Sequence, residues 1–229
     1  MRRWIRILAI LPLVTLAGCD FLGFKEWRWH QRLMLEVETP RGVVTGGSVV
    51  AIYVGSSPKW APGMGAGGMG GKVDAGEASF VEVAPGRYLF ALLGEDMEDL
   101  AFDVFFDRKG KDQKEIADQI ELLRATREVP RENYPLLVTF EDINDPTTVK
   151  RVDPDYLAAS FGPGVSLKRI TLTLTDGPVT EGVINTLDWV EGTRIDPARN
   201  EGRSDTLRYP NDSPRGYGTL SLSEFIRRR

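Results

Sequence analysis

The clearest pattern in the chain is an alternation of side chains over residues 27–39. The odd positions carry Trp, Trp, Gln, Leu, Leu, Val and Thr, while the even positions carry Arg, His, Arg, Met, Glu and Glu. A period of two predicts a β-strand with one buried face and one wet face. A Pro-Arg-Gly turn and a second apolar run over residues 48–54 follow, so the two segments are predicted to form an antiparallel hairpin.

Further segments are also typical of strands. Residues 78–83 and 87–93 lie on either side of a Pro-Gly turn, and the second of them is apolar on both faces, as in a central strand. Residues 136–141 predict another strand. In residues 168–175 Ile and Leu alternate with Thr, which predicts a strand with one wet face. Residues 219–225 are expected to return as an edge strand.

Helical spacing follows in the middle and late parts of the chain. Apolar residues at intervals of three and four predict helices near residues 96–107, 113–126 and 179–188. An Asp-Pro pair predicts a shorter helix that ends at about Phe161. Strand-rich and helical parts that are separate in the sequence predict one α+β domain over residues 27–229. We expect mainly an antiparallel β sandwich or twisted sheet with two or three peripheral helices.

Two stretches have no regular pattern. Residues 55–71 hold seven glycines and predict a Gly-rich loop between strands. Within it Gly63, Gly65 and Gly68 match G-x-G-x-x-G, but no helix is predicted directly after them, so dinucleotide binding is not predicted. Residues 192–218 are rich in Arg, Asp, Asn, Pro and Gly and predict a long surface excursion.

Residues 1–18 have the layout of a secretory signal peptide. Three arginines and no acid fall in the first six residues, and an apolar run over residues 7–17 ends in small residues. A helix that spans a membrane needs about 20 apolar residues, so the run predicts a cleavage signal and not an anchor helix. The segment Leu16–Cys19, with the sequence Leu-Ala-Gly-Cys, resembles the lipobox of bacterial lipoproteins.

The lipobox resemblance implies a covalent lipid anchor. In that family the cysteine thiol is diacylated, the peptide is cut just before it, and the new amino terminus usually gains a third acyl chain. The resemblance implies that residues 1–18 are removed, that Cys19 is the lipidation site, and that residues 19–26 form a lipidated N-terminal segment. Two or three acyl chains, of which palmitate is typical, would hold the protein at a bacterial membrane facing the periplasm.

The sequence leaves the choice of membrane open. In enteric lipoproteins an aspartate directly after the cysteine favours the inner membrane, and Asp20 has that position, but the rule varies among bacteria. Four aromatic residues near the anchor either lie within reach of the lipid headgroups or cover one end of a sheet. These residues are Phe21, Phe24, Trp27 and Trp29.

Charge and cysteine content narrow the classes of partner. Removal of the signal segment takes away three of the 29 basic residues and none of the 33 acidic ones, so the mature chain has a formal charge of −7. A nucleic-acid partner is therefore not predicted. Cys19 is the only cysteine, so no disulfide can form within the chain, and stability must come from packing.

The sequence predicts no catalytic residue and no cofactor. The sole histidine, His30, has no Gly-x-Ser-x-Gly motif to work with, and one histidine with an acylated cysteine cannot supply the usual ligands of zinc. His30 lies between Arg28 and Arg32 on the polar face of the first strand. This basic strip suits anionic headgroups or glycans, or is a strand face open to solvent.

The weak candidates for a metal site are acidic residues in turns. Asp142, Asn144 and Asp145, with Asp153 and Asp155 further on, are closely spaced oxygen ligands of the kind that holds Ca²⁺. Asp and Asn before Pro are also ordinary turn and cap residues, and that alternative is favoured.

Three motifs resemble a group of predicted lipoproteins in Gram-negative bacteria, over about residues 27–225. They are L-V-T-F-x-D-x-N-D-P-x-x-V-x-R-V-D-P from Leu137 to Pro154, then F-G-P-G-V-x-L-x-x-I and T-D-x-P-V-T-x-G. No activity is assigned to that group, so the resemblance implies no catalytic residues. The function predicted is a membrane-anchored envelope lipoprotein that binds or scaffolds an envelope protein or polymer without catalysis. The alternative is a periplasmic enzyme or Ca²⁺-dependent binder that uses the acidic turns at 142–155.

Overall fold

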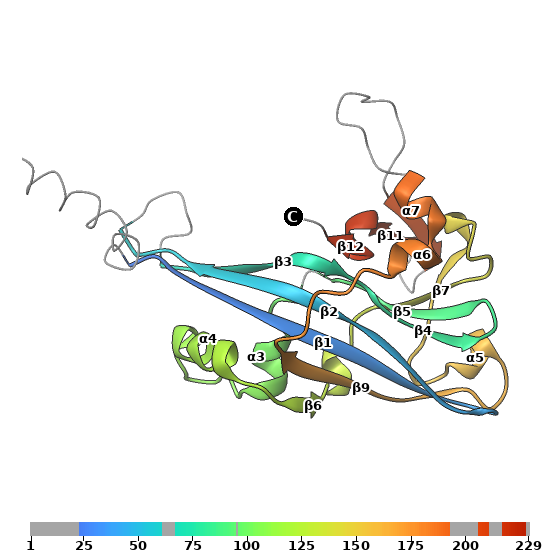
Figure 1. Cartoon of the computed structure of the whole chain (residues 1–229), viewed down its shortest axis with the longest axis horizontal. Helices are drawn as coiled ribbons and strands as arrows, with labels where there is room; N and C mark the ends of the chain where they lie inside the picture. The colour runs from blue at the N-terminus through green and yellow to red at the C-terminus, as the bar shows by residue number, and fades with distance from the viewer. Residues whose placement is uncertain (1–22, 61–66, 95, 193–205, 211–216, 228–229) are drawn as a thin grey trace, which may run out of the picture.

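The computed structural model describes residues 23–60, 67–94, 96–192, 206–210 and 217–227. All strand pairs in these residues are antiparallel, and short helices lie around the sheets (Figure 1). The predicted fold class, α+β with mainly antiparallel sheets and peripheral helices, is confirmed.

The longest feature is the hairpin of β1 (Lys25–Thr39) and β2 (Gly42–Ser56). The strands pair without a register shift from Lys25 opposite Ser56 to Thr39 opposite Gly42. Every odd side chain of β1 from 27 to 37 is buried, and the even ones are half-buried or exposed, so the predicted alternation is confirmed.

Four more strands complete a six-stranded sheet with the order β12-β3-β2-β1-β9-β6. They are β3 (Met69–Glu77), β6 (Thr126–Glu128), β9 (Ser166–Thr175) and β12 (Ile226–Arg227). Because β9 pairs with β1 only from His30 onwards, the first part of β1 extends past β9 together with β2 and β3. Figure 1 shows these three strands, which we call the ribbon, reaching the left end of the molecule.

A second sheet has four strands in the order β4-β5-β7-β8, and a third has two. The bounds are β4 (Ser79–Ala84), β5 (Arg87–Ala91), β7 (Leu137–Phe140), β8 (Val149–Arg151), β10 (Thr206–Pro210) and β11 (Tyr217–Ser221). β5 pairs with strands on both sides, as its two apolar faces predicted.

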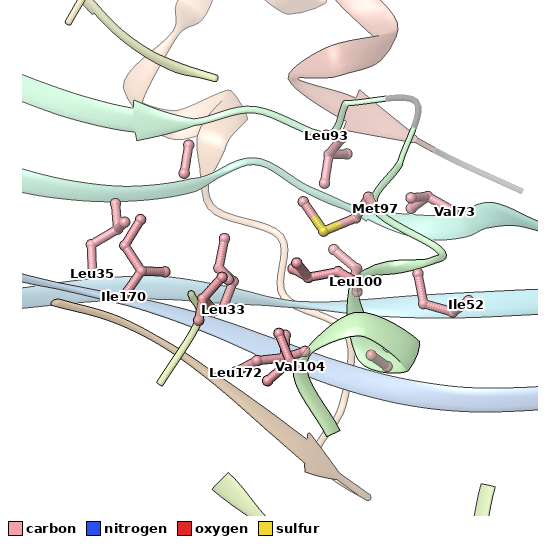
Figure 2. Close-up of a cluster of buried hydrophobic side chains, with 14 of the residues drawn as sticks. Leu33, Leu35, Ile52, Val73, Leu93, Met97, Leu100, Val104, Ile170 and Leu172 are labelled. Atoms are coloured by element: carbon pink, nitrogen blue, oxygen red, sulfur yellow. The ribbon is translucent and has the colours of Figure 1, made fainter. Parts of the chain in front are cut away.

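The four-stranded sheet separates two hydrophobic cores. One of its faces packs Val81 and Leu89 against the large sheet, in a core that includes Leu33 and Leu35 of β1. Figure 2 shows this core, where β1, β2 and β9 face Leu93, Met97 and the helix that follows. The opposite face packs Phe90 and Phe140 against Phe225, and the three ring centroids lie 5.7 to 6.1 Å apart. The helices α6 (Val183–Thr186) and α7 (Asp188–Gly192), which we call the late helices, also pack on this face.

The predicted helices are present but shorter. Residues 96–107 contain α3 (Leu100–Phe105), and residues 113–126 contain α4 (Gln113–Leu122), whose N-terminus is capped by the side chain of Asp112. α4 ends because Leu123 is extended and Thr126–Glu128 pairs with β9. The strand pairing therefore outweighs the helical spacing in the last turn.

The other helices also begin later than predicted. α5 (Ala158–Phe161) forms only the end of the predicted 154–161 helix. Residues 179–188 contain α6 (Val183–Thr186) and lead into α7 (Asp188–Gly192), while the backbone N–H of Thr180 donates to the carbonyl of Val49 in β2. That pairing keeps the first residues of the segment out of a helix.

The Gly-rich loop is shorter than predicted, because both ends of 55–71 are strand. Gly55 pairs with Gly70, and Val54 pairs with Gly71. Because glycine has no side chain, the glycines of β3 interrupt the alternation of buried and exposed residues that would reveal a strand in the sequence. At Gly71 a Cβ would lie 2.9 Å from the side chain of Glu98, which explains a glycine there.

The predicted excursion and edge strand near the end also differ. Residues 206–210 of the 192–218 excursion form β10, which pairs with β11. Residues 222–224 form a 3₁₀ turn, so 219–225 is not one strand. Among the described residues, no helix has the length and apolar character needed to cross a membrane. Cys19 and Asp20 lie outside the described residues, as does Phe21.

Candidate functional site

A strap of residues 176–182 crosses the polar face of the ribbon between β9 and α6 (Figure 1). Nδ1 of His30 lies 2.7 Å from the carbonyl oxygen of Gly177, and Thr180 Oγ1 accepts from the backbone N–H of Val49 at 2.9 Å. The strap ends on the buried carboxylate of Glu77, which accepts from the N–H groups of Gly182 at 2.5 Å and of Val183 at 2.8 Å. The histidine is thus part of the strap's attachment.

In the predicted basic strip, the charge of Arg28 is paired. The guanidinium of Arg28 stacks over the Tyr53 ring at 4.6 Å and lies 3.3 Å from Glu26 and 3.5 Å from Asp74. Lys72 lies on the same ring at 5.8 Å and 3.4 Å from Asp74. Burial, with the hydrogen bond and charge of Glu26, raises the pKa of the Tyr53 phenol.

A hollow of about 210 Å³ lies between this strip and the strap. Its lining includes Arg28, His30, Asp74, Arg124 and Asp176. Arg124 donates from Nε to Asp176 at 2.8 Å and from Nη2 to the other carboxylate oxygen, and this hydrogen bonding lowers the pKa of Asp176. The hollow therefore presents balanced charges that already satisfy one another.

A second hollow has a one-sided charge. A cleft of about 340 Å³ opens between the start of α3 and the 3₁₀ turn at Arg131–Asn133. Four carboxylates line it, and the apolar lining includes Met97 and Leu100, which are buried and appear in Figure 2. The carboxylates belong to Asp96, Asp99, Asp103 and Glu132. We call this hollow the acidic cleft.

One cation partly balances the acidic cleft. Arg108 lies 3.1 Å from Asp103 and 3.6 Å from Asp99. Next to the cleft, burial and then the charges of Asp99 and Asp96 raise the pKa of Glu98. Four carboxylates against one guanidinium leave a negative potential, which favours a cationic group.

A buried side chain of the large sheet holds one wall of the acidic cleft in place. The buried amide of Gln31 in β1 donates to the carbonyl of Met97 at 2.9 Å and accepts from the indole of Trp29 at 3.0 Å. The segment that leads into α3 is therefore fixed to the large sheet by hydrogen bonds as well as by packing. The sequence showed Gln31 on the buried face of the strand but gave no sign of its partner.

The candidate Ca²⁺ residues have partners within their own turns. Asp142 Oδ1 accepts from the backbone N–H of Asn144 at 2.9 Å and from its side-chain amide at 3.2 Å. Asp145 accepts from the N–H of Thr147 at 2.9 Å and from its hydroxyl at 2.6 Å, and these bonds lower the pKa of Asp145. Both carboxylates have the role of Asx-turn and cap residues.

The later acids are also engaged. Asp153 accepts from the N–H of Asp155, and Asp155 pairs with Arg131 at 2.8 and 3.0 Å. Within the ranges that the structure describes, no three His, Cys, Asp or Glu residues group in a way that could hold a metal ion. The turns at 142–155 therefore offer no assembled ligand set there.

Of the four aromatic residues that follow the predicted lipidation site, Trp27 and Trp29 lie in the core of the protein. Trp27 and Trp29 are 1% and 4% exposed, and the Trp27 indole donates to Asp118 of α4 at 2.7 Å. These two rings therefore cover one end of the sheet, as one of the two alternatives predicted, and are too buried to contact lipid headgroups. Phe24 instead meets Trp60 edge to face, with centroids 5.9 Å apart.

Sequence reasoning missed the acidic cleft. Asp96, Asp99 and Asp103 have a spacing of three and four, which places them along one side of a helical turn. That signal was present, but Glu132 and Tyr134 reach the cleft only through the fold. Comparison with protein-family models, curated proteins and solved structures gives no match for this chain.

Proposed function

We propose that this protein is a membrane-anchored envelope lipoprotein with a non-catalytic binding role. The lipobox at Leu16–Cys19, after basic and apolar segments in the correct order, supports the anchor. β1 begins at Lys25, which is the sixth residue after Cys19. Six residues span at most about 20 Å, and the folded body would therefore stay close to the acyl chains.

The geometry of the acidic cleft is the observation that carries the binding role. Carboxylates and apolar side chains line the cleft together, which suits a cationic group on an apolar stem, such as a lysine or arginine of an envelope protein. An anionic polymer would be repelled by the same charges.

Binding without catalysis is favoured by the surroundings of His30. Its Nδ1 is engaged by Gly177, and its neighbours in the smaller hollow include Arg28, Asp74 and Asp176, with Thr175 as the hydroxyl residue. The Thr175 hydroxyl accepts from the N–H of Gly177 and so supports the strap. This arrangement has the form of a structural attachment and not of an activated nucleophile.

The anchor is tested by intact mass and fractionation. The mature protein should begin at Cys19, carry two or three acyl chains, and stay with membranes in high salt. Cys19→Ser should leave an uncut, unacylated precursor, because only a thiol forms the thioether to diacylglycerol. A free thiol at Cys19, or a mature terminus elsewhere, would sink the lipoprotein proposal. Fractionation would also decide between the inner membrane, which Asp20 favours, and the outer one.

The binding role is tested by photo-crosslinking in intact cells. A photoreactive amino acid at Glu132, on the rim of the acidic cleft, should give a discrete protein adduct. The same probe at Glu38, an exposed position of β1 that does not line the cleft, serves as the control. Asp96→Lys should weaken the adduct at position 132. Equal labelling at positions 132 and 38 would argue against a binding cleft.

A further inference from the structure

The open end of the ribbon combines features that suit contact with a lipid bilayer. The start of β1, the end of β2 and the start of β3 meet there, at the left of Figure 1. We call this end the tip and define it by Phe24, Lys59, Trp60 and Met69. The four-stranded sheet and the late helices lie at the other side of the molecule, so the tip stands apart from them (Figure 1).

Trp60 differs from the other tryptophans of the described chain in its exposure. It is 61% exposed, whereas Trp27 and Trp29 are buried and Trp189 is half-buried. Its ring stands edge to face against Phe24, at an interplanar angle of 85°, so an aromatic pair forms the end of the ribbon. Tryptophan, with its apolar ring and polar N–H, is typical of the interface between headgroups and acyl chains.

The surroundings of the pair combine apolar and polar side chains. A hollow of about 410 Å³ at the tip is lined by Phe24, Tyr53 and Met69, by the glycines of the paired strands, and by the polar residues Lys25, Glu26, Ser56 and Ser57. Lys59, next to Trp60 in the chain, is exposed, and no ion pair of Lys59 occurs among the described residues. A lysine beside an aromatic pair favours a surface that carries anionic headgroups.

Chain length fixes the distance from the tip to the anchor. Phe24 is five residues after Cys19. Five residues span at most about 17 Å, and the polar region on each side of a bilayer is several ångströms deep. An acylated Cys19 therefore keeps the aromatic pair within reach of the interface.

We infer that the tip lies in the interface of an anionic bilayer, with Trp60 and Phe24 at the level of the headgroups and Lys59 facing anionic lipid. This inference rests on the proposed lipid anchor and adds a second, non-covalent contact to it. Two points of contact orient the ribbon, so the four-stranded sheet and the late helices point away from the membrane. The alternative is that the tip contacts a second copy of the chain instead of the bilayer, and the test below distinguishes these two possibilities.

The test uses the acylated mature protein, which begins at Cys19, in vesicles of phosphatidylethanolamine and phosphatidylglycerol whose acyl chains carry bromine near the headgroup. Bromine quenches tryptophan fluorescence only at short range, so Trp60 should be quenched while the buried Trp27 and Trp29 are not. Trp60→Phe should remove most of the quenching, and Trp189→Phe should leave it unchanged. Lys59→Gln should reduce the quenching in anionic vesicles, whereas Lys109→Gln, at an exposed site in the α3–α4 connection, should not.

The outcomes decide the inference. Quenching that disappears with Trp60→Phe at every protein-to-lipid ratio supports the tip as a membrane contact. Acylated protein whose quenching is the same with and without Trp60 overturns the inference and leaves the lipid anchor intact. Crosslinking of two tips, with quenching that falls as protein is added, assigns the tip to a second copy and also overturns it. Absence of acyl chains on Cys19 in the mass spectrum overturns the anchor and the inference together.

Discussion

The two faces of β1 make different kinds of contact: one packs in the core and the other forms ion pairs at the surface. On the inner face Trp27, Leu33 and Leu35 are buried in a continuous core, and the polar Gln31 is satisfied by hydrogen bonds inside it. On the outer face Arg28 and its neighbours pair with one another at the surface, where each ion pair contributes little. The comparison teaches that the two sides of one strand contribute unequally to stability, because burial on the inner face is worth more than ion pairing on the outer one.

The largest effect should come from an inner-face truncation. Leu35 is completely buried between the two sheets, so Leu35→Ala should lower the free energy of unfolding by about 2 to 5 kcal/mol through lost burial and the cavity left behind. Arg32→Ala, three positions away on the outer face, should change it by less than about 0.5 kcal/mol. Urea unfolding of both variants measures the contrast, and similar losses in the two would remove the division between faces.

Gln31 tests whether the inner face also positions the acidic cleft. Gln31→Leu keeps the volume but leaves the indole of Trp29 and the carbonyl of Met97 without their partner. We expect a loss of about 1 to 3 kcal/mol in the free energy of unfolding. The photo-adduct at Glu132 should weaken as well, because Met97 lines the cleft. Unchanged crosslinking in a destabilised variant would limit Gln31 to a structural role.

Asp118 tests how much the contact between α4 and the inner face of β1 contributes to stability. Hydrogen bonds from Lys25 and Trp27 lower its pKa, so ionised Asp118 stabilises the folded chain above the pKa of the unfolded state. That stabilisation is lost as pH falls below about 4. Since the side chain is half exposed, Asp118→Asn should remove only about 0.5 to 1 kcal/mol at neutral pH. The variant should also lose less stability than the wild type in acid, as measured by urea unfolding at several pH values.

Glu98 should show the smallest effect and the opposite sign. Burial raises its pKa, so the ionised form destabilises the fold, and the associated stability is lost as pH rises through the range above about 4.5. Glu98→Gln should therefore raise the free energy of unfolding at neutral pH by about a few tenths of a kcal/mol. Exposed Glu38→Gln is the matched control. A decrease in stability with Glu98→Gln would contradict the assignment.

Local patterns predicted the parts of the fold that depend on local physics. The alternation from Trp27 to Val37 predicted β1 because burial on one face imposes a period of two. β3 was missed because Gly70 and Gly71 pair through their backbones and have no side chains to reveal a face. The ends of the helices were wrong where a distant strand, such as β9 beside Thr126, decided the conformation.

The candidate sites depended even more on distant contacts. Asp96 and Glu132 are far apart in the sequence, and both line the cleft. Their segments come together where β5 pairs with β7 and the backbone N–H of Leu92 donates to the carbonyl of Leu136. Trp60 stood in a Gly-rich stretch, and nothing local tied it to Phe24. Cys19 is the opposite case, because its prediction depends only on the neighbouring sequence. The residue itself lies outside the part of the chain that the structure describes.

The uninterrupted pairing of β1 has a mechanical consequence. β1 pairs with β2 over its whole length and with β9 over much of it. A pull on the chain ahead of Lys25, directed along β1, would shear these ladders and stress many hydrogen bonds at once. Peeling would break them one after another, at a much lower force. The strand that follows the proposed anchor is therefore also the strand that is hardest to extract from the fold by tension.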